Sequence, residues 1–276
     1  MNDLIEPNVA RMSFGLPEVS AWAKFSNDFN PIHFDPHYAR SAGLGGLVVH
    51  GMLALLPVKA ALVDAAHDSG APRSRWMKFR ALFRSPVPHE SSSEMTYRDA
   101  KGQGLDFRVH AADTGQERFR GSWGPAADQG AWLDSHPLDR QTFSVVEAAE
   151  AERFRSVYPH VRPGWIALDA IVFSDFIRTK LKTLSRAAQR ERAGTATPEG
   201  KEVLMQASHT VLVDTQELGG PGPLPFDCGE LSYAMAAPEM VTSQGGIAGS
   251  VSLAVTRREK LVMLVEIGLL ARTATD

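Results

Sequence analysis

A carboxylate and an imidazole stand five positions apart near the N-terminus, at Asp28 and His33. Pro31 lies between them and bars a regular helix, so both side chains are expected to project from one bent loop. An acid and an imidazole held together can position a water and move its proton. Further on, His50 and Gly51 open a long apolar segment, and backbone N–H groups at a helix N-terminus can receive a developing negative oxygen. These are the groups needed to add water across an activated double bond, or to remove it.

The two segments resemble the signature of a known family. Asp-Phe-Asn-Pro-Ile-His at 28–33 and Gly-Leu-Gly-Gly-Leu-Val-Val-His-Gly-Met at 43–52 have the residues and the spacing of MaoC-like (R)-specific enoyl-CoA hydratases, which have the hot-dog fold. Clear resemblance covers only about the first 125 residues. Asn27 departs from the family, which usually carries glycine there, and the departure bears on the conformation of the loop.

The resemblance implies a reaction and a role for each residue of the loop. Asp28 and His33 would both hold one water, and one of them would remove its proton as the oxygen attacks C3 of a trans-2-enoyl thioester. A proton would reach C2 from the same face, giving an (R)-3-hydroxyacyl product, and the residues do not say which group is base and which is acid. The Gly51 N–H is expected to meet the charge on the thioester oxygen, with glycine letting the substrate approach the backbone. Asn30 is expected to bond loop backbone, and His50 to cap the helix or orient the loop.

A metal site is the main alternative for this loop. His33, Asp35 and His37 alternate along the chain with His50 downstream, and zinc accepts such ligands. A proline inside the stretch constrains it, however, and in the resembling family the first of these histidines faces substrate. We therefore predict no metal, and we expect Asp35 and His37 in an exposed turn that starts a helix at 38–41.

Several basic residues are candidates for binding phosphate or a protein partner. Lys78, Arg80 and Arg84, near the first predicted strand, could meet the phosphates of coenzyme A or of a carrier's phosphopantetheine. The basic run 178–192 could contact an acidic acyl carrier protein, although such runs are more often solvated helix faces. The glycines of 43–46 lack the Lys-Ser/Thr of a phosphate loop and are expected to permit a tight passage. Beyond the coenzyme A or phosphopantetheine of the substrate, no cofactor is predicted.

Composition places the chain among soluble globular proteins. It has 276 residues, 43% hydrophobic and 22% charged, with a net charge of −3, so no global basic field indicates nucleic acid or an anionic membrane. No apolar run is long enough for a membrane span. The single cysteine, Cys228, cannot form an intramolecular disulfide, and residues 1–22 do not read as a signal peptide. These features predict a cytoplasmic protein.

Hydrophobic patterning predicts the same order of elements twice. In the first half an apolar helix over 52–66 precedes short alternating segments, which are typical of antiparallel strands. These predicted strands lie at 77–85, 92–99, 104–112 and 116–123. In the second half, helical patterns at 144–157 and from 163 to 184, and a charged loop at 186–200, precede four more strand candidates. They lie near 202–214, 229–237, 246–257 and 260–270.

This repetition predicts an α+β double hot dog, in which two helix-wrapped antiparallel sheets form a pseudo-dimer. We expect a catalytic repeat at 1–125, a linker at 126–140 and a degenerate repeat at 141–276. The second repeat lacks both motifs, so it should be catalytically silent and should wall the acyl tunnel. The chain would then carry one site and act as a monomer or homodimer.

Three other functions stay open. The same residues would serve a dehydratase that acts on carrier-bound 3-hydroxyacyl groups. A hot-dog thioesterase would cleave the thioester, although the Asp/His loop is not its usual apparatus. A non-catalytic acyl-thioester binding protein would keep the fold without the chemistry.

Overall fold

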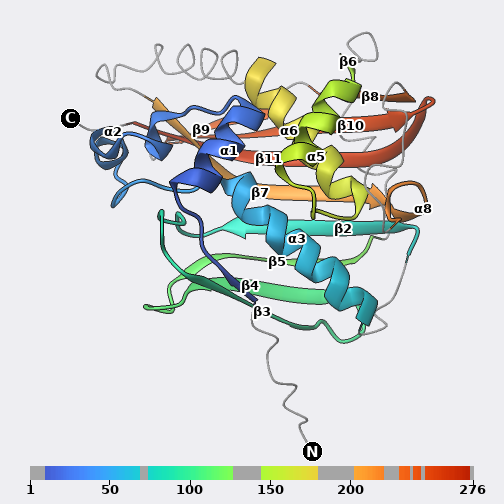
Figure 1. The fold of residues 1–276 in the computed structure, drawn as a ribbon, viewed down its shortest axis with the longest axis horizontal. Helices are drawn as coiled ribbons and strands as arrows, with labels where there is room; N and C mark the ends of the chain where they lie inside the picture. Colours follow the sequence, from blue (N-terminus) through green and yellow to red (C-terminus); the bar gives the residue numbers. More distant parts are fainter. Residues whose placement is uncertain are drawn as a thin grey trace, which may run out of the picture.

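One long antiparallel sheet curves around two central helices (Figure 1). The structure is a computed structural model that describes residues 10–68, 74–126, 144–179, 202–220, 230–236, 239–243 and 246–273. Among these residues eleven strands form the sheet, in the order β1-β3-β4-β5-β2-β7-β11-β10-β8-β6, with β9 paired to β10.

The two halves of the chain contribute similar sets of elements. The first half supplies β1 (Ala10–Met12), α1 (Leu16–Ser26), the 3-10 helix η1 (Pro31–His33), α2 (Pro36–Ser41), α3 (Gly51–Asp68), β2 (Trp76–Phe83), β3 (Ser93–Asp99), β4 (Leu105–Ala111) and β5 (Glu117–Pro125). The second half supplies β6 (Ser144–Val145), α5 (Ala148–Val157), α6 (Gly164–Thr179), β7 (Glu202–Asp214), α8 (Thr215–Leu218), β8 (Leu231–Met235), β9 (Glu239–Ser243), β10 (Gly246–Arg257) and β11 (Lys260–Thr273). The predicted helix-then-strands order therefore recurs.

The halves are joined edge to edge into a single sheet. Strand β2 pairs with β7 in antiparallel register, from Trp76 opposite Asp214 to Leu82 opposite Ser208. The sequence predicted two sheets, and this pairing makes them one, because each half leaves a strand edge whose N–H and C=O groups need partners. The two halves also share one apolar core, in which Phe79 and Trp165 lie with ring centroids 6.5 Å apart.

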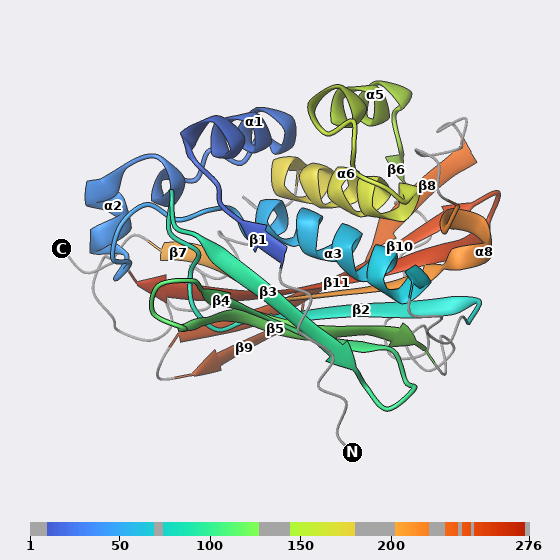
Figure 2. The same cartoon turned by 60° about the horizontal axis from the view of Figure 1, so that its bottom comes forward.

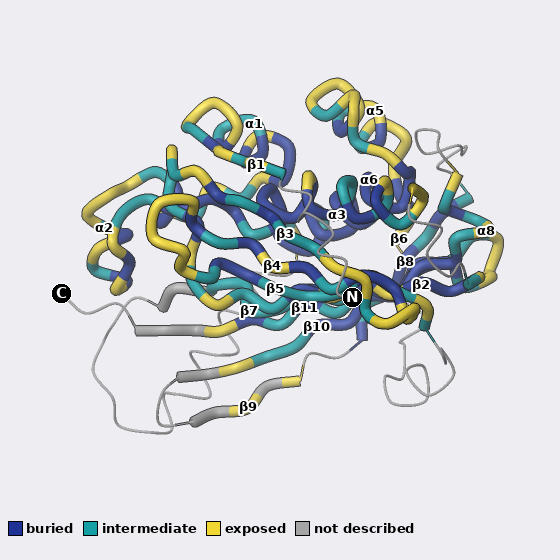
Figure 3. Tube along the Cα trace, turned by 90° about the horizontal axis from the view of Figure 1, so that it is seen from below, coloured by how far each residue is buried: buried dark blue, intermediate teal, exposed yellow. Residues whose placement is uncertain are grey.

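Helices α3 and α6 occupy the core because they are apolar on nearly all sides. They pack against each other over the sheet, while α1 and α5 pack on the outer side of α6 (Figure 2). Buried residues concentrate on α3 and α6, whereas α1, α2 and α5 carry exposed residues on their outer faces (Figure 3). In the described part of the chain, no helix has the length and the apolarity needed to cross a membrane.

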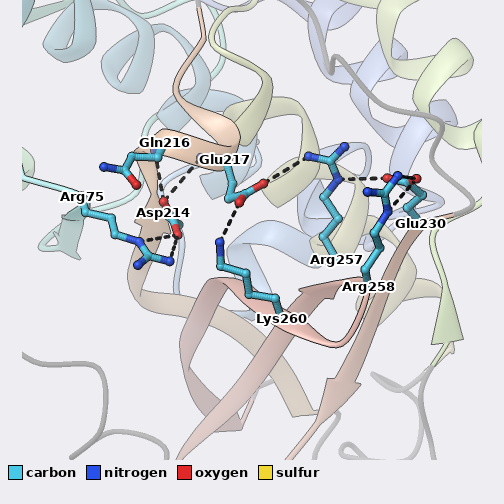
Figure 4. Close-up of polar contacts among 8 residues, drawn as sticks. All are labelled: Arg75, Asp214, Gln216, Glu217, Glu230, Arg257, Arg258 and Lys260. Carbon is cyan, nitrogen blue, oxygen red and sulfur yellow. Dashed lines mark hydrogen bonds and ion pairs between the residues drawn. The ribbon is translucent and has the colours of Figure 1, made fainter.

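At the end of the molecule opposite α2, a polar network ties the halves together (Figure 4). Asp214 is buried, caps α8 by accepting from the N–H groups of Gln216 and Glu217, and forms an ion pair with Arg75 of the first half at 2.9 Å. Ion pairs continue outward from this helix. They join Glu217 to Arg257 and Lys260, and Glu230 to Arg257 and Arg258.

Predicted and observed elements agree closely, with some differences. The apolar helix and the four strands of the first half lie within about three residues of their predicted bounds. Helix α1 and strand β9 were not predicted, and the segment predicted as a helix at 144–157 begins as the short strand β6. Most of the predicted linker 126–140, the loop 186–200 and Cys228 fall outside the described residues. The bounds of the two predicted repeats stay a prediction, since both repeats share one sheet.

Candidate active site

The loop between α1 and α3 is bent by a left-handed residue. Asn27 ends α1 with φ 58° and ψ 25°, a conformation that glycine adopts freely and asparagine tolerates. Asn27 therefore meets the backbone requirement at the position where the resembling family has glycine. Beyond it, the Ser26 hydroxyl accepts from the N–H of Asp28, and the Asn30 side chain accepts from the N–H of Ile32 and caps η1. Asn30 thus bonds loop backbone, as expected.

Two stacked histidines lie against this loop. His33 Nδ1 is 2.7 Å from the carbonyl oxygen of Val48, so Nδ1–H donates and Nε2 carries the free lone pair. His50 stacks on His33 with ring centroids 3.6 Å apart. Its Nε2–H donates to the backbone carbonyl of Asp28 at 2.9 Å. Of the two roles left open for the His50 side chain, the structure therefore shows the one that orients the loop.

A cavity of about 180 Å³ brings these groups together with the start of α3. A carboxylate oxygen of Asp28 and one ring nitrogen each of His33 and His50 all lie within 4.8 Å of one another. Both halves of the chain line the cavity. The first half supplies these three residues with Gly51, Phe83 and Arg84, and the second half supplies Phe173, Ile177, Met205, Gln206, Leu269 and Leu270. The second half thus forms one wall of the site.

Burial shifts the acid and the imidazole toward their neutral forms. Desolvation raises the pKa of Asp28 to about 6, against a hydrogen bond from Asn30 N–H that lowers it. Desolvation lowers the pKa of His33 to about 4, although its bond to the Val48 carbonyl acts in the opposite direction. The pKa of His50 is also lowered by burial and by its neighbour His33. Near neutral pH the cavity therefore holds an ionised Asp28 and a neutral His33, both of which accept hydrogen bonds.

Gly51 is the first residue of α3, where an N–H group has no partner within the helix. The space beyond its Cα is filled by Gln206 Oε1 and by the ring of Phe83, so a Cβ at this position would collide with them. From the sequence, we expected a glycine at this position because the substrate approaches the backbone closely. The structure shows that a residue of the second half approaches it closely.

The three phosphate candidates do not lie together. Arg84 lies at the cavity, with its side chain 47% exposed and 3.8 Å from Glu117. Lys78 and Arg80 are exposed residues of β2 that alternate with buried Phe79. Because side chains alternate along a strand, they point away from the helices and do not line the cavity. In the basic run 178–192, only Arg178 and Thr179 fall within the described residues, and Arg178 forms ion pairs with Glu150 and Asp175.

The ligand set considered for a metal is not brought together. Asp35 is exposed and caps α2 by accepting from backbone N–H groups, the nearest being that of His37 at 2.8 Å. The structure clusters Asp28, His33 and His50 instead. The rings of His33 and His50 are stacked in this cluster, 26° from parallel.

Sequence reasoning missed a buried polar chain behind the cavity. Lys59 of α3 forms an ion pair with Asp169 of α6, and both side chains are fully buried. Both oxygens of Asp169 lie 3.0 Å from Nε2 of His209 on β7, and Nδ1 of His209 lies 3.1 Å from Nε2 of Gln206. Burial raises the pKa of Asp169, but His209 and Lys59 outweigh it and hold that pKa at about 2. The available signal was a charged residue among apolar neighbours in each of two largely apolar helices.

Known proteins resemble the N-terminal part of the chain in sequence. A family model described as a MaoC like domain matches residues 16–114. The mitochondrial 3-hydroxyacyl-[acyl-carrier-protein] dehydratase of Arabidopsis thaliana is 40% identical over 76 residues, which are 27% of this chain and 42% of that protein. The (R)-specific enoyl-CoA hydratase of Aeromonas caviae is 50% identical over 46 residues, 16% of this chain and 34% of that protein. The chain thus spans less than half the length of these relatives.

Solved structures resemble the whole chain in fold. A MaoC-like dehydratase has a TM-score of 0.51 at 11% identity, over 97% of this chain and 98% of that one. A conserved hypothetical protein of Mycobacterium tuberculosis, described as having a double hotdog fold, has a TM-score of 0.52 at 11% identity, over 98% of this chain and 97% of that one. At this identity the likeness shows the fold alone, and it confirms the predicted double hot dog.

Proposed function

Since residues 16–114 match the model of a MaoC like domain, we propose that the chain is a hydro-lyase that reversibly hydrates trans-2-enoyl thioesters to (R)-3-hydroxyacyl thioesters. One observation carries this proposal. Asp28 and the free Nε2 of His33 face one cavity that also contains the first residue of α3. A general base, a place for water and an oxyanion donor are thereby combined.

In the proposed mechanism, the water lies between Asp28 and His33 and donates a hydrogen bond to each. One of the two accepts its proton as the water oxygen attacks C3, and a proton is delivered to C2 from the same face. The negative charge that moves onto the thioester oxygen is met by the N–H of Gly51, helped by the positive end of the α3 dipole. Dehydration is the same path in reverse.

The cavity walls favour an acyl thioester as the ligand. Phe173, Ile177 and Leu269 of the second half give an apolar surface for the acyl chain. Arg84 is the one phosphate candidate that lies at the cavity, and we propose it for the phosphates of coenzyme A or phosphopantetheine. The thioester would supply that group, and no separate cofactor is proposed.

A second candidate is the dehydration of 3-hydroxyacyl groups on an acyl carrier protein, because the Arabidopsis relative bears that name. The same residues would act, and the concentrations of substrate and product would set the direction. Comparing crotonyl-CoA with a crotonyl-loaded carrier protein separates the two candidates through kcat/KM. A cytoplasmic location and a monomeric or homodimeric state remain part of the proposal.

The test is the loss of enoyl-thioester absorbance when the purified chain meets crotonyl-CoA. Asp28→Asn and His33→Ala should each lose about 10²–10⁴-fold in turnover, which is the usual contribution of acid–base assistance. Asp35→Asn is the matched control, because this carboxylate lies in the same loop but caps α2. Release of free thiol would indicate a thioesterase instead. Near wild-type turnover in Asp28→Asn or His33→Ala would contradict the assignment.

A further inference from the structure

The side chain of Gln206 lies at the cavity without a role in the proposed mechanism. Its Oε1 atom is buried and has no hydrogen-bond partner among the described residues. The same atom lies against Gly51, at the N-terminus of α3 where the thioester oxygen is proposed to bind. A buried acceptor without a partner is costly, so its position beside the site calls for a donor.

A bulge in strand β7 directs Gln206 to this place. In the pairing with β11, Gly268 is opposite Ser208 and Leu269 is opposite Gln206, so Ala207 is an extra residue without a partner. A bulge interrupts the alternation of side chains between the two faces. Gln206 therefore reaches the helix-facing side that His209 occupies, and the two side chains meet three positions apart.

The buried chain behind Gln206 sets which end of its amide faces the site. Asp169 is ionised and paired with Lys59, so His209 donates Nε2–H to it. Burial lowers the pKa of His209, which leaves the ring neutral with Nδ1 as an acceptor. That acceptor takes a hydrogen from Nε2 of Gln206, and the amide oxygen must then point toward Gly51.

We propose that Gln206 is a specificity residue of the active site, whose amide oxygen accepts a hydrogen bond from an N–H or O–H donor close to the carbonyl of the acyl thioester. His209 and Asp169 are its positioning residues. Two groups of such substrates carry a donor close to the thioester carbonyl. They are the 3-hydroxyl of the acyl chain and the first amide N–H of the pantetheine arm. The inference rests on the proposed function, since it takes an acyl thioester as the ligand.

The experiment measures ligand binding, so its result does not depend on turnover. The Asp28→Asn chain should convert bound substrate only slowly, and Gln206→Met is added to it as a replacement of similar length that lacks the amide. Each protein is titrated calorimetrically with butyryl-CoA and with (R)-3-hydroxybutyryl-CoA. The loss of a hydrogen bond from a buried acceptor should weaken binding by roughly 10- to 100-fold. Thr210→Val, on the same strand but opposite the outward-facing Arg80 of β2, is the matched control and should leave both affinities unchanged.

The pattern of loss identifies the donor. If both ligands weaken equally, the donor is the pantetheine amide, and if only the hydroxyacyl ligand weakens, it is the 3-hydroxyl. Asp169→Asn should reproduce the loss where it remains folded, because His209 is then free to change tautomer and the amide to turn. Unchanged affinity of Gln206→Met for both ligands would overturn the inference. Failure of the Asp28→Asn parent to bind either ligand would contradict the proposed function itself.

Discussion

At the scale of single residues, one physical cause prepares both proposed catalytic groups. Burial disfavours charge, so it raises the pKa of Asp28 to about 6 and lowers that of His33 to about 4. The hydrogen bond from His33 Nδ1–H to Val48 then leaves Nε2 as the only acceptor on the ring. Perturbed acids and bases in one cavity are typical of functional sites.

The pKa of Asp28 predicts how activity depends on pH. We expect the ionised carboxylate to accept the proton of water, so kcat/KM for hydration should fall about tenfold per pH unit as the pH drops below about 6. His33 should stay neutral throughout, because its pKa is about 4. The measurement is kcat/KM for crotonyl-CoA from mildly alkaline to mildly acidic pH. A rise in rate below the pKa of Asp28 would instead assign it as the acid.

The same pKa predicts that the carboxylate of Asp28 lowers the stability of the fold. Its pKa is 3.8 without perturbation and about 6 in the folded chain, so the folded state holds the proton more tightly than the unfolded state does. The stability that the protonated carboxyl of Asp28 contributes is fully present below the unfolded-state pKa of 3.8. It is lost as the pH rises through the folded-state pKa of about 6. Asp28→Asn should therefore be more stable than the wild type above this pH, by on the order of 1–3 kcal/mol.

Urea unfolding of Asp28→Asn and the wild type at several pH values measures this difference. It should shrink as the pH falls toward the unperturbed pKa of aspartate, where Asp28 is protonated in both states. Asp35→Asn provides the comparison for a carboxylate whose pKa is lowered by backbone hydrogen bonds. A less stable Asp28→Asn above the folded pKa would mean that the carboxylate stabilises the fold.

At the scale of elements, α3 and α6 meet through a charged contact inside an apolar core. Lys59 and Asp169 are both fully buried, and His209 shares the same carboxylate. A buried ion pair adds little net stability over apolar residues, but removal of one partner leaves the other charge without compensation. Such a contact fixes how the two helices are placed relative to each other, and hence where β7 presents Gln206.

We predict that Lys59→Met lowers the free energy of unfolding by about 3–5 kcal/mol, because it leaves Asp169 buried with less counter-charge. Lys78→Met is the control, since Lys78 is exposed on the outer face of β2. Chemical denaturation of both variants near neutral pH measures the effect. Equal stability of the two variants would show that His209 alone compensates Asp169, as an imidazolium.

At the scale of the whole molecule, the described parts of the two halves share an architecture but differ beside the start of the central helix. The connection from α1 to α3 spans residues 27–50, whereas only residues 158–163 connect α5 to α6. At the start of α6, Gly164 is followed by Trp165, which is 1% exposed and stacks on Trp123 with centroids 5.3 Å apart. The indole of Trp165 lies next to the start of α6. The corresponding start of α3 lines the cavity instead.

We therefore predict one acyl-thioester site per chain. Calorimetric titration of the Asp28→Asn variant with butyryl-CoA should give a stoichiometry of one ligand per chain, whatever the oligomeric state. Size-exclusion chromatography with light scattering supplies the mass against which the chains are counted. A stoichiometry of two would show that the second half also binds the thioester.

The sequence by itself determined the features that depend on neighbouring residues. Pro31 between Asp28 and His33 imposes a bent loop, the apolar run after Gly51 forms a buried helix, and alternation locates the strands. The family motif also lies within one short stretch, so its residues converge without long-range information. The double hot-dog fold followed from repetition of these local patterns.

Only the tertiary structure decided which distant residues meet. Lys59 and Asp169 are 110 positions apart, and Gln206 reaches Gly51 only because the two halves share one sheet and β7 carries a bulge. The direction of Lys78 and Arg80 depends likewise on which face of β2 is buried. Local periodicity specifies an element and its apolar face, but the partner of a polar group is fixed by how elements from the two halves pack together.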